Sequence, residues 1–408
     1  MRVTAATFYK DYAKTVQDLK AEYNKSMEQV STGKKYADAY ENPLDYYAGK
    51  KIDNLYNDVV VKDTMIKDVV NRLEQQESAS RSFYGEMSSL NVKYEQMASS
   101  SYQGLESTVD TMHTYFLNTQ QTLAQDLNAT YENFYVMGGN DATTVPFTMS
   151  DDGMTLTYHH KFAGDDNATV MSMTYNPDTK EYSYSGTYYT SDDDGNVVTN
   201  TVAAGANADE QNAIVKRIVT AMREQGRMSL GYGDITNLST LPDTYYGGLN
   251  MVTGITSDQL RAECDATDLT QNIATFKEAM NKSAFALNAQ AIDATGDYLE
   301  SFSGTEAEKE AANTKMNEDL AYVLGNWDNA MIDVSNTFRR IGVATSTLED
   351  VQTRLQLAQD NYQKEYNDHL AIDTYDAVVK MYQGQFAYNA AMQVGSKIMQ
   401  NSLFDFVQ

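Results

Sequence analysis

The sequence predicts a mainly α-helical protein with a β-rich domain inserted in its middle. Apolar residues recur at helical spacing along both ends of the chain, while alternation of polar and apolar residues replaces that spacing between about 141 and 205. The chain has only four prolines: Pro43, Pro146, Pro177 and Pro242. They leave 44–145 and 243–408 free of proline, as long helices require.

The first helix is predicted from seven apolar residues that are spaced three or four positions apart. They are Phe8, Tyr12, Val16, Leu19, Tyr23, Met27 and Val30. This spacing places all seven side chains on one helical face. Gly33 follows them and fits a helix C-cap, and Asn42-Pro43 fits the N-cap and first residue of the next helix.

Between 44 and 133 the sequence predicts two long helices, or one interrupted helix and a second. Six apolar residues of the first run keep a heptad repeat: Ile52, Leu55, Val59, Ile66, Val69 and Leu73. Such a repeat is typical of helices that pack as in a coiled coil. Gly104 is the weak point of the run, and helix resumes at Thr256. Thr305 and Glu308 have the spacing of a capping box before a long helix that ends near Leu370.

The insertion, 141–253, has the pattern of antiparallel strands joined by turns, with a short helix expected around Ile218. It is acidic, since 141–200 contains ten Asp or Glu against two Lys. Tyrosine-rich strands can stack on sugars, so a surface- or carbohydrate-binding module is an alternative role for this domain.

Composition limits the partners. The net charge of -26 disfavours binding to nucleic acid or to an anionic membrane. No apolar run approaches the ~20 residues that span a bilayer. The N-terminus lacks the apolar core of a signal peptide, so we expect a cytosolic protein or export by a route without such a signal. Cys264 is the only cysteine, which excludes an intramolecular disulfide.

The sequence contains no pattern typical of catalysis. The four histidines are His113, His159, His160 and His369. His159 and His160 are adjacent in an expected strand, so they point to opposite faces and cannot bind one metal together. The turns at Asp151 and Asp192 lack the ligand spacing of a calcium loop. We therefore expect no enzyme, no cofactor and no metal site.

Several short motifs remain. They are Ser31-Thr-Gly-Lys-Lys, Asn42-Pro43, Phe134-Tyr-Val-Met-Gly-Gly with Pro146-Phe-Thr, Arg340-Ile-Gly-Val, and the ending Gln400-Asn-Ser-Leu-Phe-Asp-Phe-Val. Together they resemble the bacterial flagellin family, most closely its members at the junction between hook and filament, over about 1–147 and 256–408. Met137 departs from the usual aromatic residue, and Gln408 is an extra residue after the tail.

The resemblance implies a flagellin-like bundle of long helices formed by both chain ends. Terminal helices in 1–42 and 371–408 would line an inner tube, 43–140 and 254–370 would form a helical rod, and 141–253 would be an outer domain. The implied partners are hook-associated protein 1, flagellin, further copies in a ring, and the flagellar export apparatus. The implied location is extracellular, on the flagellum, without a cleaved signal peptide. A filament flagellin is the alternative within the same family.

The assembly interface is expected on the two terminal helices. On the first helix it comprises the seven-residue stripe. On the last helix it comprises Val379, Tyr382, Phe386, Ile398, Leu403, Phe404 and Phe406. We expect residues 1–40 and about 371–408 to be mobile in the monomer and to fold when neighbouring subunits bury them. The apolar tail that ends in Phe406 is also expected to bind an export chaperone.

Overall fold

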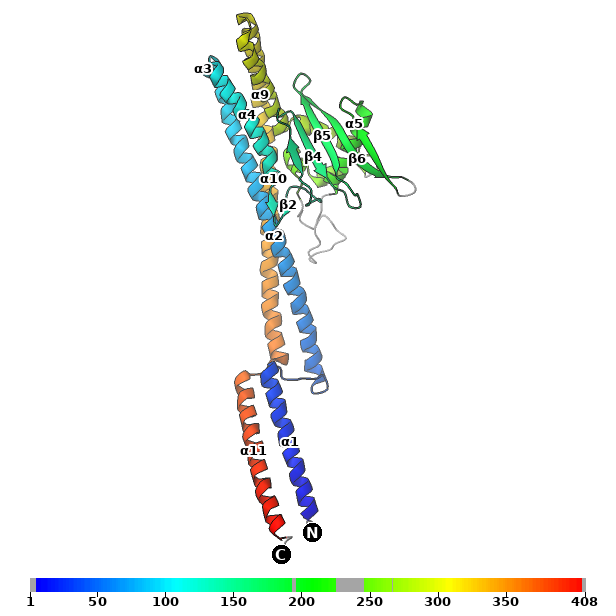
Figure 1. Ribbon diagram of the computed structural model, residues 1–408, viewed down its shortest axis with the longest axis vertical. Helices are drawn as coiled ribbons and strands as arrows, with labels where there is room; N and C mark the ends of the chain where they lie inside the picture. The colour runs from blue at the N-terminus through cyan, green and yellow to red at the C-terminus, as the bar shows by residue number, and fades with distance from the viewer. Residues whose placement is uncertain (1–4, 193–195, 225–245, 266, 406–408) are drawn as a thin grey trace. The chain divides into compact units, whose positions relative to one another are not determined.

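The computed structural model describes residues 5–192, 196–224, 246–265 and 267–405. Most of them are helical, and one five-stranded antiparallel sheet lies in the middle of the sequence (Figure 1). The predicted class, mainly α with a β-rich part, is therefore confirmed. The chain divides into two compact units, 1–64 with 351–408, and 65–350. The three-domain assignment and the flagellin-like bundle stay predictions.

The first unit contains α1 (Ala5–Thr32), the beginning of α2 (Pro43–Met97), the end of α10 (Glu306–Leu370) and α11 (Thr374–Asp405). Gly33 ends α1 in the left-handed region, with φ of 68°. Its N–H donates to the carbonyl of Gln29 at 2.9 Å, as a C-cap requires. The Asn42 Oδ1 accepts from the Asp45 N–H at 3.3 Å. The predicted helix end and helix start are therefore confirmed.

The second unit holds the remaining elements. Its helices after α2 are α3 (Ser100–Gln103), α4 (Glu106–Asp126), α5 (Ala208–Arg223), α6 (Gly248–Thr253), α7 (Ser257–Glu263), α8 (Thr270–Asn281) and α9 (Ala284–Glu300). A short 3-10 turn, Ser301–Ser303, separates α9 from α10. The predicted interruption at Gly104 is confirmed, because α3 ends at the residue before it. Thr305 and Glu308 exchange the two hydrogen bonds of the predicted capping box.

The strands pair only with their sequence neighbours. They are β1 (Thr130–Tyr131), β2 (Phe134–Tyr135), β3 (Phe147–Met149), β4 (Thr155–His160), β5 (Thr169–Asn176), β6 (Glu181–Ser191) and β7 (Val197–Val202). β1 and β2 form a small hairpin, and the larger sheet has the order β3-β4-β5-β6-β7. Burial alternates along β4 and β5, so one face of the sheet packs inward. The outward face carries mainly hydroxyl side chains, such as Thr157 beside Ser172 at 3.1 Å.

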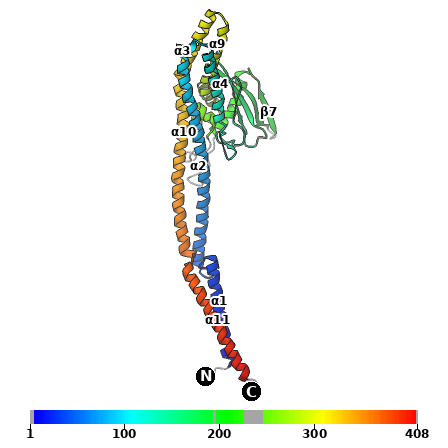
Figure 2. The same cartoon turned by 60° about the vertical axis from the view of Figure 1, so that its left-hand side comes forward.

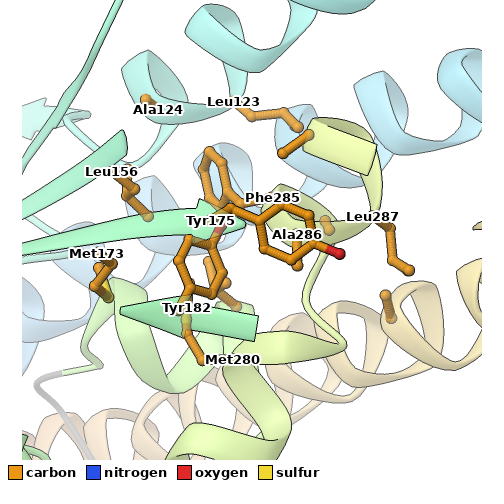
Figure 3. Packing of buried hydrophobic residues seen from close by; sticks show 14 of the residues in the cluster. Leu123, Ala124, Leu156, Met173, Tyr175, Tyr182, Met280, Phe285, Ala286 and Leu287 are labelled. Carbon is orange, nitrogen blue, oxygen red and sulfur yellow. The ribbon is translucent and has the colours of Figure 1, made fainter. Parts of the chain in front are cut away.

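The inward face of the sheet shares one hydrophobic core with the helices of its unit. Figure 3 shows Tyr175 and Tyr182 of adjacent strands beside Phe285 and Met280 of the helices. At the centre, the indole of Trp327 is fully buried and donates to the Met87 carbonyl at 3.0 Å. Trp327 is therefore a residue that packs helices together.

Candidate assembly surfaces

The two terminal helices pack against each other within the first unit. The Tyr12 hydroxyl of α1 donates to the Ala391 carbonyl of α11 at 2.6 Å. Two glycines of α11 allow this close approach. A side chain at Gly395 would overlap the Tyr12 ring, and one at Gly384 would lie 3.4 Å from the Cα of Tyr23. The helices therefore meet along a face of α11 that carries small residues.

This face of α11 has a regular spacing. Its members are at least half buried and lie four or three positions apart: Ala377, Met381, Gly384, Tyr388, Ala391 and Gly395. The sequence analysis missed it, because glycine and alanine add little to an apolar pattern. The signal that could have found it is the heptad-like spacing itself.

The predicted stripe on α1 faces this surface only in part. Five of its members are half-buried: Tyr12, Val16, Leu19, Tyr23 and Val30. Phe8 and Met27 are exposed to 51% and 45%. Among the described residues of α1, none is fully buried. The pair of helices thus covers the stripe without enclosing it.

A second apolar stripe on α11 is open to solvent. Tyr382 and Phe386 from the predicted set are exposed to 62% and 77%. Val379, also from the predicted set, precedes them on the same helix and is half-buried. Tyr375 is exposed as well, and the prediction missed it. Spacings of four, three and four place these side chains on one face of the helix. Large aromatic side chains at such exposure are typical of a surface that another protein covers.

The end of α11 lies partly outside the described structure. Its backbone is helical through Ile398, Leu403 and Phe404, whose side chains are not described. Phe406 lies outside the described residues. Their assignment to the interface therefore stays a prediction.

The connector between α1 and α2 is hydrogen-bonded to the segment between α10 and α11. The Lys35 N–H donates to the Leu370 carbonyl at 2.7 Å, and the Ile372 N–H donates to the Gly33 carbonyl at 3.0 Å. Asp45 lies 3.0 Å from the His369 Nδ1. The Ser31-Thr-Gly-Lys-Lys motif therefore forms a short two-stranded contact with the segment that links α10 to α11.

The glycine pair of the Phe134-Tyr-Val-Met-Gly-Gly motif makes a tight turn. A Cβ at Gly138 would overlap the carbonyl oxygen of Asp141, and Gly139 has φ of 65°. The buried Gln76 side chain donates to the carbonyls of Val136 and Tyr246. This motif fixes the path from α4 into the sheet, so its role in the structure is to hold the backbone.

The adjacent histidines His159 and His160, considered above as metal ligands, lie in strand β4 on opposite faces of the sheet. His160 is buried and its Nδ1 lies 3.2 Å from the Tyr158 hydroxyl, while His159 on the opposite face is half-buried. Burial lowers the pKa of His160, which favours its neutral form. Across the described residues, no three His, Cys, Asp or Glu side chains lie where they could hold a metal ion.

Four of the strand tyrosines are turned inward, whereas Tyr188 and Tyr189 of β6 are only half-buried. Tyr158, Tyr175, Tyr182 and Tyr184 are buried in the core. They are therefore not available to stack on a sugar. The tyrosine-rich pattern, which suggested a carbohydrate-binding role, has packing as its cause at these four positions.

None of the helices, over the part of the chain that the structure describes, has the length and apolarity to cross a membrane. No family model and no curated protein matches the chain. Several solved structures are similar to it, among them these two. A chain from Vibrio parahaemolyticus, described as a flagellar hook-associated protein, has 10% identity and a TM-score of 0.35, with 79% of this chain and 100% of that chain covered. The flagellar hook-associated protein 3 of Legionella pneumophila has 12% identity and a TM-score of 0.39, with 78% and 97% covered.

Proposed function

We propose that this chain is a structural subunit of the bacterial flagellum, of the hook-associated protein 3 type. It would join hook-associated protein 1 to the flagellin filament as one of a ring of copies. The observation that carries the proposal is the open aromatic stripe on α11, in a chain whose ends carry the flagellin-like motifs. The proposed role is binding and assembly, not catalysis.

Burial of the exposed aromatic side chains would stabilise an assembly of the terminal helices. Complete burial of a side chain such as Phe386 is worth about 1.5–3 kcal/mol. Tyr375, Tyr382 and Phe386 would all contribute when a neighbouring subunit covers α11. Among the described side chains of α1 and α11, only the small residues Ala377 and Gly395 are buried, which supports the expectation that neighbours complete the packing.

A deletion strain tests the position at the junction. Loss of a junction protein should release unpolymerised flagellin into the medium from cells that still carry hooks. Loss of a filament flagellin should instead leave hooks without filament and no secreted flagellin from this gene. Electron microscopy of the cells and immunoblotting of the medium separate the two proteins. Normal filaments in the deletion strain would refute both.

A point variant tests the surface itself. Phe386→Asp places a charge on the open stripe and should leave the monomer folded, because this side chain is 77% exposed. We expect folded protein that no longer supports motility. The matched control is Gln385→Asp, the same new charge at the exposed neighbouring position. Full motility with Phe386→Asp would contradict the role of the stripe.

The export chaperone is proposed to bind the C-terminal tail. Deletion of 399–408 should abolish co-purification of the chaperone while the rest of the chain stays folded. Unchanged co-purification would exclude the tail as the binding segment. It would not affect the assembly role, which the deletion strain and Phe386→Asp test separately.

A further inference from the structure

Strand β7 forms an open edge of the five-stranded sheet. It pairs with β6 on one side, and among the described residues no strand pairs with its other side (Figure 2). Val197, Val198 and Thr199 are exposed, and the whole strand contains no charge, proline or glycine. The opposite edge is protected, because β3 has only three residues and follows Pro146. Proteins usually blunt a sheet edge by such means, so the unprotected edge at β7 requires an explanation.

The backbone of β7 offers hydrogen-bonding groups on this edge. The Asp192 N–H donates to the Asn196 carbonyl at 3.0 Å, and the register with β6 then continues unbroken along the strand. Hydrogen-bonded pairs alternate in an antiparallel ladder. The even-numbered residues of β7 therefore direct their backbone groups toward β6. Thr199 and Thr201 direct theirs away from the sheet.

The sequence of β7 is complementary to itself. Residues 198–202, Val-Thr-Asn-Thr-Val, read the same in both directions. If two copies pair antiparallel about Asn200, Thr199 lies opposite Thr201, and Val198 lies opposite Val202. The two threonines are the residues whose backbone groups face the edge, so the hydrogen bonds match. Cross-strand Thr–Thr and Val–Val pairs are favourable, and no like charges meet.

We propose that β7 pairs antiparallel with β7 of a second copy of this chain, with Asn200 on the two-fold axis. The contact is isologous and makes one continuous sheet from two copies. A chain with a net charge of -26 repels its own copies at most surfaces. The uncharged β7 edge is a place where two copies can meet. This contact uses no residue of α1 or α11, so it stands apart from the proposed flagellar role.

A disulfide across the axis tests the register. At Asn200 the two strands would form a non-hydrogen-bonded pair, with Cα atoms about 4.5 Å apart, which is within disulfide range. The variant Asn200→Cys in a Cys264→Ser background should form a covalent dimer with oxidised glutathione. The matched control is Thr190→Cys, an exposed residue that pairs with Val198 from the neighbouring strand. It should remain largely monomeric. Equal rates of dimer formation in both variants would overturn the proposal.

Sedimentation measures the contact without a crosslink. The full chain should shift with rising concentration from 45.6 kDa toward twice that mass. Thr199→Pro removes an N–H that faces the open edge and keeps the ladder to β6, so it should abolish the shift. Ser183→Lys adds a charge elsewhere on the sheet and should retain it. A wild-type chain that stays monomeric, or self-association that survives Thr199→Pro, would overturn the proposal. Neither result depends on flagellar assembly.

Discussion

Asp293 on α9 is a carboxyl group that the folded chain holds in an unfavourable environment. Burial and the charge of the nearby Asp297 together raise its pKa from the ordinary 3.8 to about 6, and the Lys315 ammonium, 3.8 Å away, offsets only part of this rise. A rise of this size corresponds to at most about 3 kcal/mol against the ionised form in the folded state, and solvent screening at this half-buried position reduces the cost to about 1–3 kcal/mol. Since the folded state binds this proton more tightly than the unfolded state, the free energy of unfolding falls as the pH rises from about 4 to about 6.

The substitution Asp293→Asn removes this penalty and keeps the shape of the side chain. We expect the variant to be more stable than the wild type by about 1–3 kcal/mol at pH 7.5, and to differ little from it at pH 4. Urea denaturation at the two pH values measures the difference. The fluorescence of Trp327 is a suitable signal, because it is the only tryptophan and it is fully buried in the same unit.

The control is Asp328→Asn, which removes one negative charge from an exposed position on α10. It should change the free energy of unfolding by the same small amount at both pH values. If Asp293→Asn stabilises the chain equally at pH 4 and pH 7.5, charge in general is responsible, not the buried carboxyl. If it destabilises the chain at pH 7.5, the ion pair with Lys315 outweighs the burial, and the reasoning is wrong.

Four further substitutions test the core, a tight turn, a helix interior and a helix cap by urea denaturation followed by circular dichroism. Trp327→Ala removes a fully buried side chain and its hydrogen bond to Met87, and should cost about 3–5 kcal/mol; a loss below about 1 kcal/mol would contradict the packing. Gly138→Ala forces a Cβ onto a carbonyl oxygen and should cost about 1–3 kcal/mol, whereas Gly85→Ala, where a Cβ meets nothing, should stabilise α2 by about 0.5–1 kcal/mol. Asn207→Ala removes the capping box of α5 and should cost about 1–2 kcal/mol, with no loss if solvent replaces the cap.

Much of the helical architecture follows from local sequence signals. Gly33 and Asn42-Pro43 predicted a helix end and a helix start, because their conformations depend on neighbouring residues only. Gly104 predicted the break after α3 for the same reason. Five of the six heptad residues, such as Ile52 and Val59, are buried as predicted. The prediction is wrong for Leu55, which is 38% exposed.

The relation between the terminal helices could not be predicted in the same way. The stripe from Phe8 to Val30 was evident, but its partner surface on α11 is built from Ala377, Gly384 and Gly395. These small residues allow α1 to approach α11 closely. Their effect therefore depends on a helix more than 300 residues away in the chain. The exposed Tyr375 was missed because a pattern of apolar residues does not distinguish a covered face from an open one.

The long-range contacts of Trp327 impose an order on how this polypeptide can fold. Its indole N–H donates to the Met87 carbonyl, 240 residues away in the chain. The hydroxyl of Tyr94, whose ring packs against the indole, donates to the Asn288 Oδ1 across a separation of 194 residues. A chain that emerges N-terminus first, from a ribosome or a narrow channel, therefore has α2 and α4 available long before their partners arrive. Closure over such distances is slow. The second unit acquires its central packing only after about four-fifths of the polypeptide is free, and until then the apolar residues of α2 and α4 lack these partners.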